Sequence, residues 1–283
     1  MVPERSVCVV TDSTADIPGH VAEELGITVV PLSLTVGGET FVDGSITMAE
    51  FFRRMNASKE LPTTSQPSVG AFLEVFESGL ARCKDVVCIN VSNRLSGTIE
   101  SAREAARTLG DRVHVLDTLN LSWGEGYQVV AAAKAAAAGE SLEGVKRAFE
   151  DAHERIHMVV GLDTLENLAK GGRIGRVSAF VGGVLNMKVM FTVGEDGAFV
   201  PVARARGGKA ALQASVDWLA EHVSPEKRAA FGVLHAESPD KAAWLEDAIR
   251  SRFNVAELAV IETGPVIGTH TGTGWGLTGA ELD

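Results

Sequence analysis

The chain has 283 residues, 45% of them hydrophobic and 22% charged, as in an ordinary globular protein with room for two compact domains. The formal net charge of -11 argues against general nucleic-acid binding, which requires a basic surface. No apolar run approaches the ~20 residues that cross a bilayer, and the apolar stretch 7–10 is too short for a signal peptide, so we expect a cytoplasmic protein without a transmembrane segment.

Three cysteines, Cys8, Cys83 and Cys88, are scattered along the chain without a C-x-x-C pair. Two of them lie in segments that we expect to be strands. The sequence therefore predicts reduced, structural thiols in a cytosolic protein.

The first part of the chain alternates short apolar segments with helical patterns, and polar residues stand at the expected starts of helices. Asp12 and Ser13 follow the first strand and are expected to serve turn and cap roles. Thr47 with Glu50 forms a capping box, and Ser68 is expected to cap the next helix. The expected elements are a strand over 7–10, a helix over 21–25, a strand over 28–36 that turns at 37–38 into a strand over 39–41, a helix from 47 through 55, an extended loop over 61–68 and a helix over 71–80.

The segment 86–98 is the most informative stretch of the chain. Its first six residues read as a strand buried on both faces, and a helical pattern follows from Ile99 to Leu109. Ligands of open α/β sheets bind beyond the carboxyl ends of the strands, where the free N–H groups of a helix's first turn favour an anion. Ser96, Gly97 and Thr98 are therefore expected to form one wall of an anion site; the alternative is that Ser96 is only a helix N-cap.

The pattern continues with a strand over 113–117, an alanine-rich helix over 127–138 and a helix over 142–154 behind Ser141. Alternation of strand and helix predicts a parallel sheet with helices on both faces. We assign residues 1–155 to an N-terminal α/β domain.

From Ile156 onward the pattern changes. Two expected strands, 187–193 and 198–203, flank the turn 195–197 and should pair antiparallel. Residues 156–283 are therefore assigned to a second α/β domain with a mixed sheet and helices. Its other expected elements are strands over 156–162, 229–234 and 256–261 and helices over 163–169, 210–222 and 239–252.

The last informative stretch is 264–274, which we expect to be a glycine-rich loop that carries His270 over the crevice of the first domain. Residues 274–279 spell G-x-G-x-x-G, but the chain ends four residues later, without a helix on which a pyrophosphate could sit. We therefore do not interpret this motif as a dinucleotide site.

The sequence lacks the motifs of several kinds of catalytic and binding site. Gly207-Gly-Lys209 is not a P-loop, the histidines are scattered without metal-ligand spacing, and Ser96 does not stand in a G-x-S-x-G elbow. No metal or cofactor is predicted. A serine hydrolase of lipid esters, with Ser96 as nucleophile and His270 as base, remains the alternative to an anion-binding function.

The segment 168–210 contains seven Lys or Arg residues against two Asp or Glu, a local excess of +5 in an acidic chain. Such a group is either a solvated face or a surface that steers an anionic ligand or an acidic partner. Its last three cations, Arg204, Arg206 and Lys209, form a possible docking face for a partner.

The motifs taken together resemble the DegV family of bacterial fatty-acid-binding proteins, over essentially the whole chain. The matching segments are Thr-Asp-Ser-Thr at 11–14, Asp43-Gly44, Thr-Ser-Gln-Pro-Ser at 64–68, Ser-Gly-Thr at 96–98, Lys-Gly-Gly-Arg-Ile at 170–174 and His-Thr-Gly at 270–272.

This resemblance implies two α/β domains with a long-chain fatty acid, such as palmitate, between them. It implies that Thr64 and Ser96 hold the carboxylate, with His270 nearby, and that the second domain forms the acyl-chain pocket. Ser65, Gly97 and Thr98 complete the candidate fatty-acid-binding set. The fatty acid is the only ligand that the resemblance implies. The protein itself is expected not to be an enzyme.

The resemblance further implies, for members of the fatty acid kinase system, a separate ATP-binding kinase subunit to which the carboxylate is presented. For Arg173 we favour a structural role at the glycine turn over direct ligand contact. Two positions depart from the family pattern: Val189 and Thr273 stand where the family often has proline.

Overall fold

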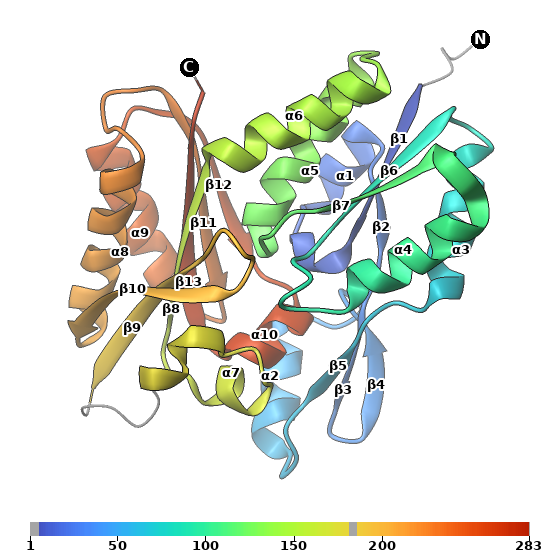
Figure 1. Cartoon of the computed structure of the whole chain (residues 1–283). Helices are drawn as coiled ribbons and strands as arrows, with labels where there is room; N and C mark the ends of the chain where they lie inside the picture. Colours follow the sequence, from blue (N-terminus) through green and yellow to red (C-terminus); the bar gives the residue numbers. More distant parts are fainter. Residues whose placement is uncertain (1–5, 181–185, 283) are drawn as a thin grey trace.

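The computed structural model of the protein describes residues 6–180 and 186–282. Its strands form three sheets: a four-stranded sheet and a small three-stranded sheet built before residue 118, and a six-stranded sheet built from residue 156 onward. Figure 1 shows the four-stranded and six-stranded sheets side by side, with helix α10 below and between them. The two α/β units expected from the sequence are present.

The four-stranded sheet is entirely parallel, with strand order β2-β1-β6-β7. Every residue of β6 is buried, because helices cover both faces of this sheet. The strands are β1 (Val7–Asp12), β2 (Thr28–Val30), β6 (Asp85–Asn90) and β7 (Val113–Asp117).

Alternate residues of β1 and β6 point to opposite faces and pack into two separate cores. Val9 and Ile89 pack with α1, α5 and α6, whereas Val10 and Cys88 pack with α3 and α4. This is the predicted two-sided sheet. The helices are α1 (Gly19–Leu25), α3 (Val69–Leu80), α4 (Thr98–Leu109), α5 (Ser122–Ala137) and α6 (Leu142–Arg155), with 3-10 turns η1 (Ser13–Ala15) and η2 (Gly110–Arg112).

The three-stranded sheet is antiparallel, in the order β4-β3-β5, and packs against α2 and α10. It corrects two sequence predictions. The single strand expected over 28–36 is divided at Pro31 between two sheets, because proline cannot donate to a ladder. The loop expected over 61–68 contains a strand paired with β3. The elements are β3 (Ser33–Val36), β4 (Glu39–Val42), β5 (Thr63–Ser65) and α2 (Met48–Ala57).

The six-stranded sheet is mixed, as predicted, with the order β10-β9-β8-β13-β11-β12. All its pairs are antiparallel except β11 with β12. The segment that spells G-x-G-x-x-G is the central strand β13, so its glycines belong to a sheet. The strands are β8 (Ile156–Leu162), β9 (Met187–Val193), β10 (Phe199–Arg206), β11 (Ala229–Ala236), β12 (Val255–Glu262) and β13 (Gly274–Glu281).

One face of this sheet packs against α8 and α9, and the other looks toward the first domain (Figure 1). Trp275 and Leu277 of β13 point to the helices, whereas Val91 and Leu121 of the first domain pack on the opposite face. The interior between the two domains is therefore apolar. The remaining helices are α7 (Glu166–Lys170), η3 (Gly175–Phe180), α8 (Gly208–His222), α9 (Pro239–Arg252) and α10 (Pro265–Thr271).

Three predicted caps are present: the hydroxyls of Thr47, Ser68 and Ser141 each accept a backbone hydrogen bond at the start of α2, α3 and α6. The glycine-rich loop expected over 264–274 is instead mostly helix α10. Pro265 stands at its first position, where proline fits a helix, and Gly272 ends it with a φ of 64°.

The expectation of three reduced thiols is wrong. Cys8 in β1 and Cys83, just before β6, form a disulfide, and only Cys88 is a free, buried thiol. The parallel pairing of β1 with β6 brings the two Cα atoms to 5.7 Å although 75 residues separate them in sequence. A non-local contact of this kind leaves no local motif.

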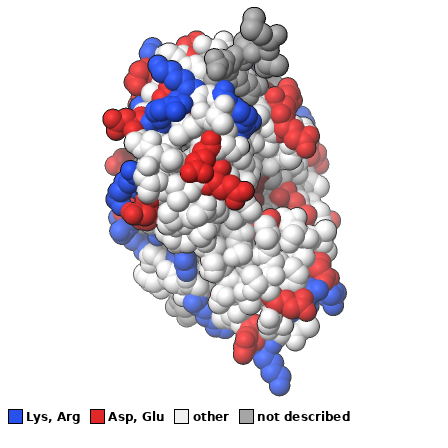
Figure 2. Space-filling view, turned by 90° about the vertical axis from the view of Figure 1, so that its right-hand side faces the viewer, with Lys and Arg blue, Asp and Glu red and all other residues white. Residues whose placement is uncertain are grey.

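Charges on the side of the molecule shown in Figure 2 are mixed, with small groups of both signs separated by uncharged surface and no broad basic patch. This face is unsuited to general nucleic-acid binding. Within the described ranges, no helix is both long and apolar enough to cross a membrane.

Candidate functional site

Thr64 and His270 meet at the boundary between the small sheet and α10. Thr64 lies on β5, where pairing with Leu34 of β3 fixes its position. Its Oγ1 is 2.8 Å from Nε2 of His270, in a hydrogen bond between residues 206 apart in sequence. The contact therefore joins the first domain to the C-terminal helix.

The imidazole of His270 is buried against Gly171. A Cβ atom on Gly171 would lie 2.6 Å from His270 Nδ1, so only glycine leaves room for the ring. Burial, and secondarily the nearby Arg173, lowers the pKa of His270 to about 4, so the ring is neutral near pH 7. Nδ1 has no hydrogen-bond partner within the described part of the chain.

Ser96 lies in the turn that leads from β6 into α4. Its hydroxyl is 2.9 Å from Thr98 Oγ1 and accepts the N–H of Thr98 at 3.3 Å. The helix begins at Thr98 with Gly97 as its N-cap residue, so Ser96 is not the cap. Ser96 N–H donates to Ser92 O, which closes a turn before the helix begins. Ser96 therefore lies in this turn, on the wall of a cavity.

Thr64, Ser96 and His270 line one cavity between the domains, which we call the head-group cavity. Arg173 also lines it and donates to Leu95 O (3.1 Å) and Gly171 O (2.7 Å). These bonds hold the glycine turn. The other lining residues are Thr14, Leu32, Val91, Leu95, Leu121, Leu168, Phe199, Val266, Ile267 and Thr271.

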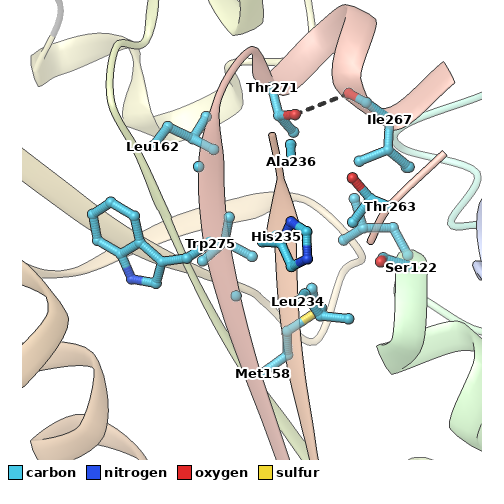
Figure 3. Close-up of a pocket in the computed structure, with 14 residues that line it drawn as sticks. Ser122, Met158, Leu162, Leu234, His235, Ala236, Thr263, Ile267, Thr271 and Trp275 are labelled. Atoms are coloured by element: carbon cyan, nitrogen blue, oxygen red, sulfur yellow. Dashed lines mark hydrogen bonds between the residues drawn. The ribbon is translucent and has the colours of Figure 1, made fainter. Parts of the chain in front are cut away.

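A second, predominantly apolar cavity lies along the inner face of the six-stranded sheet, and we call it the chain cavity. The two cavities share Leu121, Ile267 and Thr271 in their linings, so they adjoin each other. Figure 3 shows the chain cavity, where Leu162 and Leu234 approach from the sheet and Ile267 from α10.

Glycines of β13 keep the chain cavity open. A Cβ on Gly274 would lie 2.7 Å from the Leu162 side chain, and one on Gly276 would lie 3.1 Å from Leu234. Both leucines line the cavity. The glycine pattern that resembles a nucleotide motif thus serves a strand that borders an apolar space.

An outer groove adjoins the head-group cavity on its solvent side. It shares Thr64, Arg173 and His270 with the cavity and is bordered by Leu61 and Lys170. A group held by these three residues would therefore be close to the surface on one side and to an apolar interior on the other.

Two carboxylates of the first domain hold the start of α10. Asp16 accepts the N–H of Gly264 at 2.7 Å and the hydroxyl of Ser122 at 2.5 Å. Asp43 accepts the N–H of Val266 at 3.1 Å. Burial raises the pKa of both carboxyls, that of Asp16 to about 7. These contacts fix the helix that carries His270.

The other predicted site residues lie outside the cavity lining. Ser65 is exposed on β5, Thr98 is buried beneath Ser96, and Gly97 packs against Gln66, whose Oε1 would be 2.2 Å from a Cβ on Gly97. The possible docking residues form a separate exposed group on the edge strand β10 and at the start of α8. They are Arg204, Arg206 and Lys209.

Sequence reasoning missed Thr14 and α10 as cavity walls. Thr14 stood inside a motif interpreted as a turn, and hydroxyls and glycines concealed the helical character of 265–271. The proline after Gly264 was the one signal of a helix start.

The arrangement does not support the serine hydrolase alternative. Among residues that the structure describes, no hydrogen bond joins Ser96 to His270, since Ser96 pairs with Thr98 and His270 with Thr64. A serine nucleophile requires a base within hydrogen-bond reach. The same described residues contain no cluster of three His, Cys, Asp or Glu side chains suited to a metal ion.

Comparison with known proteins adds independent information. The model of a family described as "Uncharacterised protein, DegV family" matches residues 6–280. The chain belongs to the DegV family. A curated relative, the DegV domain-containing protein YejH of Lactococcus lactis, is 34% identical over 275 residues, which cover 95% of this chain and 97% of the relative.

Solved DegV structures share the fold. A DegV family protein from Thermus thermophilus, described by its fatty acid binding, is 35% identical with a TM-score of 0.93, over 98% of this chain and all of that one. The Fatty Acid Kinase (Fak) B3 protein of Streptococcus pneumoniae, loaded with linoleic acid, has a TM-score of 0.84 over 98% of this chain and all of that one. At 24% identity, the latter likeness establishes the fold alone.

Proposed function

We propose that this DegV-family protein binds a long-chain fatty acid, with the carboxylate at Thr64, Ser96 and His270 and the hydrocarbon in the chain cavity. The observation that carries the proposal is that Thr64, Ser96 and the neutral imidazole of His270 line one cavity, and that a predominantly apolar cavity adjoins it. The fatty acid binding described for the Thermus thermophilus protein supports it.

The energetics favour a ligand with a long tail. Burial of about fourteen methylenes at roughly 0.8 kcal/mol each contributes on the order of 11 kcal/mol, before the opposing loss of freedom on binding. A buried carboxylate requires hydrogen-bond donors, which the hydroxyls of Thr64 and Ser96 supply when His270 Nε2–H donates to the Thr64 oxygen. The tail therefore provides affinity, and the head-group cavity fixes orientation.

The test is titration of delipidated protein with hexadecanoic acid. The double variant Thr64→Ala, Ser96→Ala should bind at least about tenfold more weakly than wild type, because two donors are lost from a desolvated carboxylate. Thr35→Ala with Thr40→Ala is the matched control, since these hydroxyls pair with each other at 2.9 Å on the same small sheet and line neither cavity. Equal binding by wild type and the cavity double variant would contradict the assignment of the head-group site.

We further propose that the protein performs no turnover itself and presents the bound carboxylate to a separate ATP-dependent kinase subunit. The outer groove supports this step, because it leads from the surface to Thr64 and His270. Arg204, Arg206 and Lys209 are proposed to dock the partner. Phe199 lines the head-group cavity at the start of β10, and at ~3.3 Å per strand residue Arg206 lies roughly 23 Å along the strand from it.

Charge reversal tests the docking face in a reconstituted pair with the kinase. Changing its three cations, Arg204, Arg206 and Lys209, to Glu should slow acyl phosphate formation at least several-fold and leave fatty acid affinity unchanged, since the group is remote from the cavity. The matched control reverses three exposed cations of the first domain, Arg82, Lys84 and Arg107. If both triple variants slow acyl phosphate formation equally, or if neither slows it, then Arg204, Arg206 and Lys209 belong to ordinary solvated surface.

We propose a cytoplasmic location, where ATP is available to such a kinase. The disulfide between Cys8 and Cys83 is uncommon in that compartment. Alkylation of free thiols in intact cells before lysis, followed by mass spectrometry of the fractionated protein, tests the location and the pairing together.

A further inference from the structure

Among the few polar residues in the mostly apolar wall of the chain cavity, Thr263 has an unpaired hydroxyl. The residue Thr263 is 6% exposed and lines this cavity, and its hydroxyl has no hydrogen-bond partner in residues 6–180 and 186–282. An unpaired buried hydroxyl is unfavourable, whereas valine would fill the same volume without it. A threonine at this position therefore requires an explanation.

Strand geometry directs this hydroxyl into the cavity. Thr263 N–H donates to His235 O at 2.9 Å, so the ladder of β11 with β12 extends to Thr263. Side chains two apart on a strand share a face, and Ile261 packs on the face toward the first domain. Figure 3 shows Thr263 on that side, beside Ser122, with Trp275 pointing the opposite way.

Ser122 supplies a second hydroxyl at the same place. It is 1% exposed, lines the chain cavity and donates to Asp16 at 2.5 Å, so its oxygen keeps lone pairs that can accept a hydrogen bond. His235 and Thr271 also contribute to the lining. His235, whose Nδ1 likewise has no hydrogen-bond partner among the described residues, is in register with Glu262, so its side chain points to the face opposite that of Thr263. The Thr271 hydroxyl already donates to Ile267 O at 3.0 Å. The polar spot thus consists of Thr263 and Ser122.

We propose that the chain cavity recognises an acyl chain that carries a hydroxyl group away from its carboxylate, through hydrogen bonds with Thr263 and Ser122. A ligand hydroxyl can accept from Thr263 and donate to Ser122 at once, whereas an unsubstituted chain leaves Thr263 unpaired. A site that hydrogen-bonds a ligand hydroxyl discriminates against the analogue that lacks it. This inference rests on the proposed fatty-acid function and specifies its ligand class.

The test compares octadecanoic acid with a panel of monohydroxy octadecanoic acids whose hydroxyl stands at successive carbons. At least one positional isomer should bind about tenfold more tightly than the unsubstituted acid. In Thr263→Val this preference should disappear while affinity for octadecanoic acid is kept or improved. Thr263→Ser, which keeps the hydroxyl, should keep the preference.

The outcomes separate this inference from the function on which it rests. Tight binding of octadecanoic acid with no preferred isomer, or a preference that survives Thr263→Val, overturns the hydroxyl site and leaves fatty acid binding intact. Failure to bind any of the acids overturns both.

Discussion

His270 illustrates how single residues make the head-group cavity suited to a carboxylate without a direct ion pair. Burial and Arg173 keep the imidazole neutral by lowering its pKa to about 4, and Thr64 holds its Nε2. Arg173 directs two of its N–H groups to backbone carbonyls. Neutral donors therefore surround the proposed carboxylate position, with one cation nearby.

Substitution of Gly171 tests whether the position of His270 matters. In Gly171→Ala the new methyl would lie 2.6 Å from Nδ1, so the ring must shift, which disturbs its hydrogen bond with Thr64. We expect fatty acid affinity to fall several-fold, in line with loss of about 1 kcal/mol from one hydrogen bond. Gly19→Ala, where no atom lies within 4 Å of the added methyl, is the control and should bind as wild type does.

Asp16 predicts a pH dependence of stability. Its folded pKa of about 7 exceeds the ordinary 3.8, so the folded state binds more protons than the unfolded state between these values. The contribution of Asp16 to the free energy of unfolding is therefore largest below about pH 4. It falls as pH rises to about 7, by up to ~1.4 kcal/mol per pH unit. Asp16→Asn should remove this loss, and asparagine tolerates the φ of 49° at this position.

Urea unfolding at several pH values measures the effect. The free energy of unfolding of Asp16→Asn minus that of wild type should increase from pH 5 to pH 8. Parallel pH profiles of the two free energies of unfolding would show that folding does not raise the pKa of the Asp16 carboxyl.

At the scale of elements, we expect β13 to limit the length of ligand that fits. A leucine at Gly276 would extend toward Leu234 and fill part of the chain cavity. Gly276→Leu should weaken octadecanoic acid binding at least about tenfold and affect decanoic acid much less, because only the longer tail reaches the blocked region. Equal weakening of both acids would indicate general damage to the fold rather than a shortened cavity.

Elements with a regular pattern were predictable from the sequence, and those fixed by distant partners were not. β6 and its flanking helices follow from hydrophobic periodicity and hydroxyl caps. In contrast, β5 is a strand only because β3 lies beside it, and α10 is held by Asp16 and Asp43, more than 200 residues earlier. Local propensity carries no information about such partners.

The same distinction applies to the candidate site. Thr64, Ser96 and His270 were singled out from motifs, and the structure places all three on one cavity. The turn that moves the helix start from Ser96 to Thr98 depends on Ser92. No residue of the chain cavity was assigned to the acyl-chain pocket from the sequence. Its apolar lining is indistinguishable in sequence from an ordinary core.

At the scale of the whole molecule, the disulfide closes a loop of 75 residues within the first domain. In the chain-entropy description a loop of this length stabilises the folded state by roughly 4 kcal/mol. Reduction should therefore lower the midpoint of urea unfolding.

Thiol counting tests the disulfide directly. Protein denatured without reductant should react with one equivalent of a thiol reagent, at Cys88, and with three after reduction. Three reactive thiols in unreduced, freshly purified protein would instead support the reduced state expected from the sequence.

The measurement that bears most directly on fatty acid binding is native mass spectrometry of protein purified from bacteria, followed by solvent extraction and identification of the released lipid. We expect one bound acid of roughly 14 to 18 carbons per chain, since a long tail supplies the binding free energy, and its loss in Thr64→Ala, Ser96→Ala. A wild-type protein that carries no acid and takes none up when supplied would contradict the account.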